Sequence, residues 1–466
     1  MLGMGNMRQW LMNISLVGGW FPAAAFAVIA VLSVTLLVSA AVSKRDGRIL
    51  ATVLPIGVEA VSGMVGYVVA WLLSDVFVVF DVGLGSRVMS WVAAGFAIAG
   101  FAIVHIVLSR GMMRVAAAIL TVFAILAAAI GIDQSYGEYA TIGSLFGEDS
   151  YSQADLTGLA KRKDLITVAQ WRKQAANGTI RNIPANGTVN KIDIPATKSQ
   201  FEARKALVYL PPAALADSKR KPALPVVLML SGQPGSPGRV FQAGGIQTMM
   251  DGYAKTHDGL APIVIAADQL GTDSHNTLCV DSKVYGNALT YLTQDVVDWV
   301  KTNLPAAQDA KDWAIAGFSQ GATCSLQIGV NHPDLFGTMI PTDSEIKPTN
   351  GSRQEMIDRF FDGDTTAYEN QVPVNAIRNH APTHQMLIIG AGEKDTTSIR
   401  NVKTIAPVAA KAGMRVAAVE SSGNAHDWHA VQDVLRYGLA VFGHDTGLDG
   451  ANPNLSDYPN LKRITI

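Results

Sequence analysis

The sequence predicts a chain in two parts, four transmembrane helices followed by an α/β domain with a doubly wound, mostly parallel sheet. The first third of the 466 residues carries few charged side chains, and most Asp, Glu, Lys and Arg lie after it. From residue 189 onward, short β-like runs alternate with helix-like segments. That alternation is typical of parallel strands whose connecting helices cover both faces of a sheet.

Four apolar stretches are long enough, or nearly so, to cross a hydrocarbon core that needs about 20 residues. They cover about residues 20–42, 49–73, 88–108 and 115–132, and they define an expected transmembrane region of residues 1–132. A cleaved signal peptide is the alternative for the first stretch. No charged segment and no small-residue cleavage site accompany it, and three further stretches follow, so we expect four retained helices.

The short loops between these stretches predict the orientation, because basic residues tend to remain in the cytoplasm. Basic residues occupy the first and third loops: Lys44, Arg45, Arg48, Arg110 and Arg114. The opposite side carries mainly acidic residues: Asp75, Asp81, Asp133 and Glu138, with a single Arg87. We therefore expect a multi-pass protein of the plasma membrane with both termini and the α/β domain outside the cytoplasm.

Residues 133–184 are polar and are expected to form a linker with one helix near Trp171. The α/β domain is expected to span residues 185–445, and residues 446–466 to form a C-terminal tail. The expected strands are residues 189–194, 205–210, 225–230, 262–267, 313–316, 338–341, 385–389 and 415–420. The expected crossing helices are residues 286–303, 321–332 and 402–412.

The run Gly317-Phe318-Ser319-Gln320-Gly321 follows one of these strands and precedes a helix-like stretch. This is the pattern of a nucleophile elbow, the strand-to-helix turn that holds a catalytic serine in the α/β-hydrolase fold. Glycine suits both flanking positions because the tight turn leaves no room for side chains. An ordinary β-to-α turn is the alternative. The strand, the helix and the residues that follow favour Ser319 as a nucleophile.

A serine hydroxyl needs a neighbouring base, and that base needs an anion to fix its tautomer. In this fold the chain order is serine, acid, histidine, with the last two on loops after later strands. Asp395 is the expected acid, and Glu393 on the same short loop is the alternative. His426, which comes first after the last core strand, is the expected base, and His429 is expected at the rim of the site.

Two backbone N–H groups are expected to stabilise the oxyanion that forms when the serine attacks a carbonyl. One belongs to Gln320, the residue after the nucleophile. The second is expected from the loop Ser231-Gly232-Gln233-Pro234-Gly235, where Gln233 is the candidate because proline has no N–H.

The two cysteines of the chain, Cys279 and Cys324, both fall in the part expected outside the cytoplasm. An oxidising compartment permits a disulfide between them. Two small buried thiols are the alternative.

Several other classes of function have no support in the sequence. The formal net charge of −1 offers no basic surface for nucleic acid. The histidines are scattered, and His380 and His384 lack the glutamate of a zinc-protease helix. No glycine-rich loop has the spacing of a phosphate or dinucleotide site. We therefore expect no metal and no cofactor.

The domain resembles the esterase D-like branch of the α/β-hydrolases, which includes feruloyl esterases and the mycolyltransferases of actinobacterial envelopes. The likeness covers about residues 189–442 and lies in these segments: 206–212, Gly317 to Gly321, 332–336, 392–395 and 426–428. The resemblance implies an acyl-enzyme mechanism with Ser319, Asp395 and His426 as the triad. Mycolyltransferases typically use a glutamate as the acid, so Glu393 remains a candidate.

The sequence thus predicts a membrane-anchored, extracytoplasmic serine ester hydrolase that acts on lipid or glycolipid esters of the membrane or envelope. The architecture resembles that of bacterial hydrolases that remove amino acids from aminoacylated phospholipids, and such lipids are the expected substrate. Acyl transfer to a sugar or glycolipid, as in the mycolyltransferases, is one alternative. A non-catalytic membrane scaffold is the other.

Overall fold

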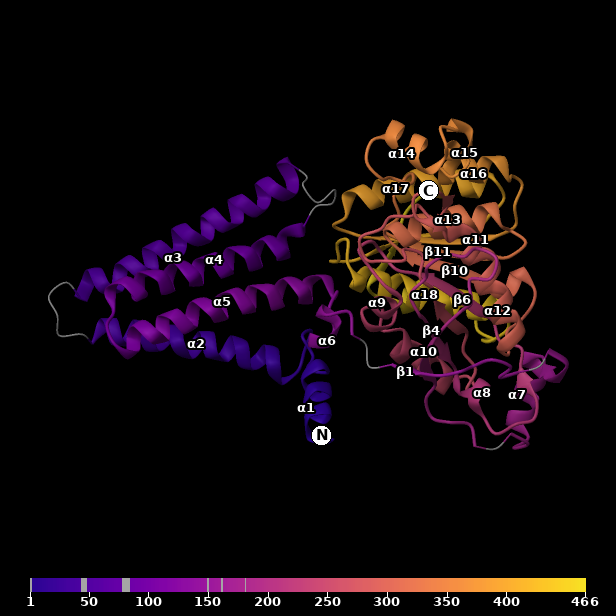
Figure 1. Ribbon diagram of the computed structural model, residues 1–466, viewed down its shortest axis with the longest axis horizontal. Helices are drawn as coiled ribbons and strands as arrows, with labels where there is room; N and C mark the ends of the chain where they lie inside the picture. The colour runs from indigo at the N-terminus through magenta and orange to yellow at the C-terminus, as the bar shows by residue number, and fades with distance from the viewer. Residues whose placement is uncertain (1, 43–47, 78–83, 149–150, 161, 181) are drawn as a thin grey trace. The chain divides into compact units, whose positions relative to one another are not determined.

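The computed structural model describes residues 2–42, 48–77, 84–148, 151–160, 162–180 and 182–466. It contains a helical unit that ends at Glu148 and an α/β unit that holds most of the chain after it (Figure 1). Lys44, Arg45 and Asp81, which contribute to the expected orientation, lie outside the described residues.

Among its described residues, the helical unit contains four long apolar helices and two short ones. Its helices are α1 Leu2–Met12, α2 Trp20–Ala41, α3 Arg48–Trp71, α4 Gly85–Leu108, α5 Met112–Tyr136 and α6 Ile142–Leu145, and a π-helical turn, Leu72–Val76, extends α3. In the part of the chain that the structure describes, four helical stretches are long and apolar enough to cross a membrane: Trp20–Ala41, Thr52–Val76, Gly85–Leu108 and Met112–Tyr136. They coincide with the four stretches that the sequence predicts.

Glycines allow the long helices to approach closely. A Cβ atom added to Gly100 on α4 would lie 2.3 Å from Oγ of Ser62 on α3. A Cβ added to Gly131 on α5 would lie 2.2 Å from the ring of Trp91 on α4. Small residues at helix contacts are typical of membrane bundles, where close van der Waals packing supplies much of the attraction between helices.

The α/β unit is built on a sheet with the strand order β1-β3-β4-β7-β6-β10-β11-β12-β13-β14. Its strands are β1 Ser152–Gln153, β3 Thr188–Ile192, β4 Ala206–Leu210, β6 Val226–Leu230, β7 Ile263–Ala266, β10 Trp313–Phe318, β11 Thr338–Thr342, β12 Met386–Gly392, β13 Arg415–Ser421 and β14 Leu461–Arg463. The strands from β7 to β13 in this order are parallel, whereas β4 and β14 run antiparallel to their neighbours. The eight strands expected from the sequence correspond to β3, β4, β6, β7 and β10 to β13.

Helices cover both faces of this sheet, so its central parallel strands, β6, β7, β10, β11 and β12, are buried on both sides. On one face lie α12 Val296–Asn303, α13 Gln320–Asn331 and α17 Thr396–Lys411, and on the other lie α9 Pro237–Gln242, α10 Ile246–Lys255 and α18 Trp428–Asp445. Alternate residues of β6 enter the two cores: Leu228 packs on one face, and Val227 and Met229 pack on the other. The remaining short elements are α7 Val168–Ala176, α8 Pro212–Leu215, α11 Ala288–Thr290, α14 Arg353–Phe360, α15 Thr365–Glu369, α16 Pro373–Asn379, β2 Leu165–Ile166, β5 Lys221–Pro222, β8 Asp281–Ser282 and β9 Gly286–Asn287.

The structure differs from the sequence-based division at both ends of the domain. Part of the expected linker belongs to the fold, because β1 pairs with β3 and Trp171 on α7 is fully buried, with its indole N–H donating to the carbonyl of Asp258 at 3.1 Å. The expected C-terminal tail contributes β14, and Leu461 and Ile464 are buried.

Candidate active site

Ser319 lies in a strained turn between β10 and α13. Its backbone has φ 55° and ψ −117°, and a non-glycine residue with positive φ is uncommon. Such strain persists only where the surrounding structure fixes it, and it clusters at functional sites. Here the N–H of Ser319 donates to the carbonyl of Thr342 at 3.0 Å, and the N–H of Thr323 donates to the carbonyl of Ser319 at 3.0 Å. The side chain is half-buried.

The two glycines of the elbow are required by close backbone contacts. A Cβ on Gly317 would lie 2.2 Å from the carbonyl oxygen of Gly321, and a Cβ on Gly321 would lie 2.2 Å from that of Ser231. Both obstacles are main-chain atoms, which cannot swing aside as a flexible side chain can. The first turn of α13 therefore lies directly against the end of β6.

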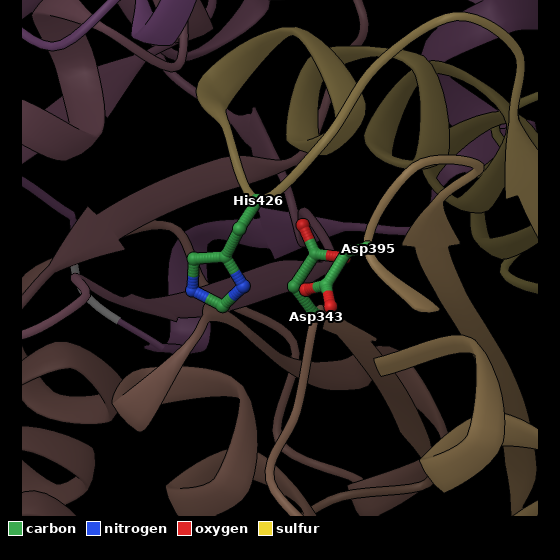
Figure 2. Close-up of side chains that lie close together, drawn as sticks. All are labelled: Asp343, Asp395 and His426. Atoms are coloured by element: carbon green, nitrogen blue, oxygen red, sulfur yellow. The ribbon is translucent and has the colours of Figure 1, made fainter. Parts of the chain in front are cut away.

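His426 lies beside two aspartates, Asp343 and Asp395. One ring nitrogen and one oxygen from each carboxylate all lie within 4.8 Å of one another. Figure 2 shows one nitrogen of the imidazole turned toward the pair of carboxylates. Asp343 is fully buried and Asp395 is 8% exposed. The three residues follow β11, β12 and β13, and parallel strands end at the same edge of a sheet.

Each carboxylate has one oxygen held by a backbone N–H. Oδ1 of Asp395 accepts from Ser398 at 3.0 Å, so this aspartate also caps α17. Oδ1 of Asp343 accepts from the N–H of Gly392 at 2.9 Å. These bonds fix the orientation of both acids relative to the imidazole.

Glu393, the alternative acid, lies outside this cluster and has another role. Its carboxylate accepts from Nζ of Lys462 at 2.9 Å and from the N–H of Gly423 at 2.7 Å. The hydrogen bond from Lys462, followed in size by that from Gly423, lowers the pKa of Glu393 below its ordinary value. Lys394 N–H donates to the carbonyl of Asn424 at 2.8 Å. The loop that holds Glu393, Lys394 and Asp395 is therefore bonded to the loop that leads into His426.

The loop that leads from β13 to His426 is hydrogen-bonded to α18 where it begins. Oδ2 of Asp433 accepts from Oγ of Ser421 at 2.6 Å and from the side-chain amide of Asn424 at 3.2 Å. His429 lies in the first turn of α18 and is half-buried. Of the two histidines, His426 is the one that forms a close group with both acids.

Of the two expected oxyanion donors, Gln320 directly follows the nucleophile, and Gln233 belongs to a loop that approaches it. Gln320 is the first residue of α13, and the first N–H groups of a helix have no acceptor within the helix. Gly232 approaches the serine so closely that an added Cβ would lie 3.5 Å from Cβ of Ser319. Gln233 follows it in the same loop. The role of both N–H groups as oxyanion donors stays a prediction.

Cys279 and Cys324 are joined by a disulfide, with the Cα atoms 5.7 Å apart. It connects the loop after β7 to α13, the helix that begins beside the nucleophile. The pairing is the one that the sequence favours.

Asp343 is a candidate site residue that the sequence analysis did not select. It directly follows β11, and the rule that ligands bind at the carboxyl ends of parallel strands is a signal that could have identified it. Together with Asp395 and His426 it also offers the oxygen and nitrogen donors that a divalent metal takes. The three side chains are therefore compatible with either a catalytic acid–base group or a metal site.

Comparison with known proteins identifies relatives for most of the α/β unit. A family model described as Putative esterase matches residues 198–438. A Corynebacterium glutamicum protein, described as uncharacterized, is 32% identical over 333 residues, which cover 70% of this chain and 74% of that protein. The structure of an S-formylglutathione hydrolase from Agrobacterium tumefaciens matches with 16% identity and a TM-score of 0.46, over 57% of this chain and 98% of that one. A ferulic acid esterase from Anaeromyces mucronatus matches with 19% identity and a TM-score of 0.42, over 55% of this chain and 90% of that one.

Proposed function

The chain belongs to the esterase family whose model covers residues 198–438, and we propose that it is a serine ester hydrolase with Ser319, His426 and Asp395 as its triad. One observation supports the assignment of these roles to particular residues. A strained serine between two obligatory glycines lies at the same edge of the sheet as an imidazole with two buried carboxylates. This arrangement has the parts that acyl transfer requires.

The proposed reaction proceeds through an acyl-enzyme. Oγ of Ser319 attacks the ester carbonyl carbon while its proton passes to the imidazole of His426, which Asp395 holds in the required tautomer. The N–H groups of Gln320 and Gln233 stabilise the oxyanion. Collapse breaks the bond to the alcohol, which leaves with the proton from His426. Water then attacks the acyl-enzyme by the same route and releases the acid.

We propose further that the substrate is a lipid ester of the membrane or envelope, with aminoacylated phospholipids as the leading class. Four helices that are long and apolar enough to span a membrane support this assignment, because anchoring an esterase keeps it close to such lipids. The basic residues of the first and third loops support a hydrolase unit on the extracytoplasmic side.

The proposal is tested by replacing the nucleophile in the full-length protein. Ser319→Ala is expected to abolish labelling by a fluorophosphonate probe and to lower ester hydrolysis by about 10⁴-fold or more, since a triad acts as a unit. Ser325→Ala is the matched control, because Ser325 is a fully buried serine of the helix that follows Ser319, and its Oγ bonds only the carbonyl of Ala322 at 2.8 Å among the hydrogen bonds described. A Ser319→Ala protein that still hydrolyses esters at the rate of this control would refute the assignment.

The substrate class is tested in membranes. Lipids extracted from cells that carry the intact chain and from cells that carry Ser319→Ala are compared by mass spectrometry, and aminoacylated phospholipids are expected to accumulate with the variant. Accumulation of an unacylated sugar or glycolipid acceptor instead would indicate acyl transfer. Identical lipids in the two strains would exclude a lipid ester as substrate.

A further inference from the structure

The two loops that carry the expected oxyanion donors are connected by the side chain of Gln269. This residue lies in the loop after β7 and is fully buried. Its Nε2 donates to the carbonyl of Ser231 at 2.7 Å and lies 3.3 Å from Oγ of the same serine. It also donates to Oε1 of Gln320 at 3.2 Å. One amide therefore bridges the start of the Gln233 loop and the residue after the nucleophile.

The same loop holds Gln320 from its other side. Nε2 of Gln320 donates to Oδ1 of Asn276 at 3.2 Å. The carbonyl of Gln269 accepts from Oγ1 of Thr277 at 2.7 Å, which fixes the loop internally. The disulfide described above ties this segment to α13. Both ends of the Gln320 amide are thus bonded to the loop after β7.

The far end of the Gln233 loop is fixed through Arg204. Its guanidinium binds both oxygens of the buried Asp268, with Nε at 3.0 Å and Nη2 at 2.8 Å. Nη2 also donates to the carbonyl of Gly235 at 2.9 Å. A two-point contact of this kind restricts geometry more than a single bond does. Asp268 and Gln269 are consecutive, so one segment holds the Gln233 loop at both ends.

We propose that Gln269 is a positioning residue that sets the separation between the oxyanion donors of Gln233 and Gln320. This inference rests on the proposed esterase activity. Oxyanion donors are effective because they are held in place before charge develops, and loss of one typically costs about 10²- to 10³-fold in kcat. Without the amide bridge both N–H groups remain, but their spacing is no longer fixed. The cost falls on the transition state, where the charge develops.

The experiment compares Gln269→Met with Gln327→Met in the full-length protein. Gln327 is a matched control because it is also a buried glutamine that contacts the loop after β7, donating to the carbonyl of Leu278 at 3.3 Å. Gln269→Met is expected to lower kcat for a soluble p-nitrophenyl ester by about 10- to 100-fold, with less than about a threefold change in KM. The rate of Ser319 labelling by a fluorophosphonate is expected to fall by a similar factor. Gln327→Met is expected to change neither quantity by more than about threefold.

Gln269→Asn provides a second test if the methionine variant folds poorly. It keeps the amide but is one methylene too short to reach Ser231 and Gln320 together, so kcat is expected to lie between the values of the wild type and Gln269→Met. Equal losses in Gln269→Met and Gln327→Met, or a rise in KM with unchanged kcat, would overturn the positioning role. Wild-type protein without Ser319-dependent hydrolysis would overturn the proposed function as well, so the two failures are distinguishable.

Discussion

Asp343 gives His426 a second buried carboxylate neighbour beside Asp395, whereas a triad requires only one. A neutral imidazole has a single N–H and can donate it to one acceptor. The second carboxylate therefore acts on the histidine mainly through its charge. An opposite charge within about 4–6 Å favours the protonated imidazole, which cannot serve as a base.

Replacing Asp343 by Asn is therefore expected to shift the pH dependence of the reaction. The acid limb of kcat/KM should move to lower pH, because loss of the neighbouring negative charge favours the neutral, basic form of His426. Asp395→Asn is expected to lower kcat by about 10³- to 10⁴-fold through loss of the correct tautomer. Steady-state rates between pH 4 and 9 on an ester substrate measure both effects.

A large loss of kcat in Asp343→Asn together with a small loss in Asp395→Asn would instead identify Asp343 as the acid of the triad. Excess EDTA is expected to leave all rates unchanged. A rate that falls with EDTA and returns with a divalent cation would assign the cluster of Asp343, Asp395 and His426 to metal binding.

The elbow is the element whose sequence most strongly determines its geometry. Gly317→Ala would place a Cβ 2.2 Å from the carbonyl oxygen of Gly321, so it is expected to destabilise the fold by about 3 kcal/mol or more. Gly252→Ala is the matched control, because Gly252 lies within α10 with no other atom within 4 Å of an added Cβ. It is expected to stabilise the protein by about 0.5–1 kcal/mol through the higher helix propensity of alanine. Urea unfolding monitored by tryptophan fluorescence measures both, and equal effects of the two changes would contradict the steric account.

Asp295, the residue before α12, holds the turn at residues 197–199 through its carboxylate. Its buried carboxylate accepts from the N–H groups of Lys198 and Ser199, both at 2.9 Å. Burial alone would raise the pKa of Asp295, but the hydrogen bonds from Ser199 and Lys198 more than offset it and leave that pKa below its usual value of 3.8. A carboxyl with a lowered pKa stabilises the fold above its unfolded pKa, and this contribution is lost as the pH falls through the folded pKa.

Asp295→Asn is therefore expected to destabilise the protein by about 1–3 kcal/mol at pH 7. The difference from the wild type should shrink below about pH 4, as the wild-type carboxyl becomes protonated. Thermal unfolding of both proteins at several pH values measures this difference in stability. The exposed Asp298, which pairs with Nζ of Lys198 at 2.7 Å, supplies the control Asp298→Asn, with an expected effect below about 1 kcal/mol. A destabilisation by Asp295→Asn that does not change with pH would rule out the charge-based explanation.

Elements with strong local patterns could be predicted from the sequence, and those that depend on distant partners could not. The central strands are continuous apolar runs, and the elbow has its two glycines, so both were found. The strand β14 covers only Leu461–Arg463 and is specified by its pairing with β13. Gln269 carries no pattern of its own, and the only signal for Asp343 is its place just after a strand. Their roles arise only when the loops after β7, β11 and β13 converge at one edge of the sheet.

The basic loops between the apolar helices predict which side of the membrane the hydrolase unit occupies. The chain has two cysteines, and they are joined to each other. Wild-type protein should therefore react poorly with a thiol reagent, and an introduced cysteine reports its own location. Met112, at the start of α5, is 81% exposed and lies in the region expected to face the cytoplasm. Gly252 on α10 has room for a side chain and belongs to the hydrolase unit.

A membrane-impermeant maleimide added to intact cells is expected to label Gly252→Cys and to leave Met112→Cys unlabelled until the membrane is permeabilised. The physical reason is the retention of basic loops in the cytoplasm, which leaves the end of α5, and the unit that follows it, on the opposite side. The reverse pattern would place the hydrolase unit in the cytoplasm. It would then remove the support for an envelope substrate while leaving the esterase assignment intact, because the triad chemistry does not depend on the compartment.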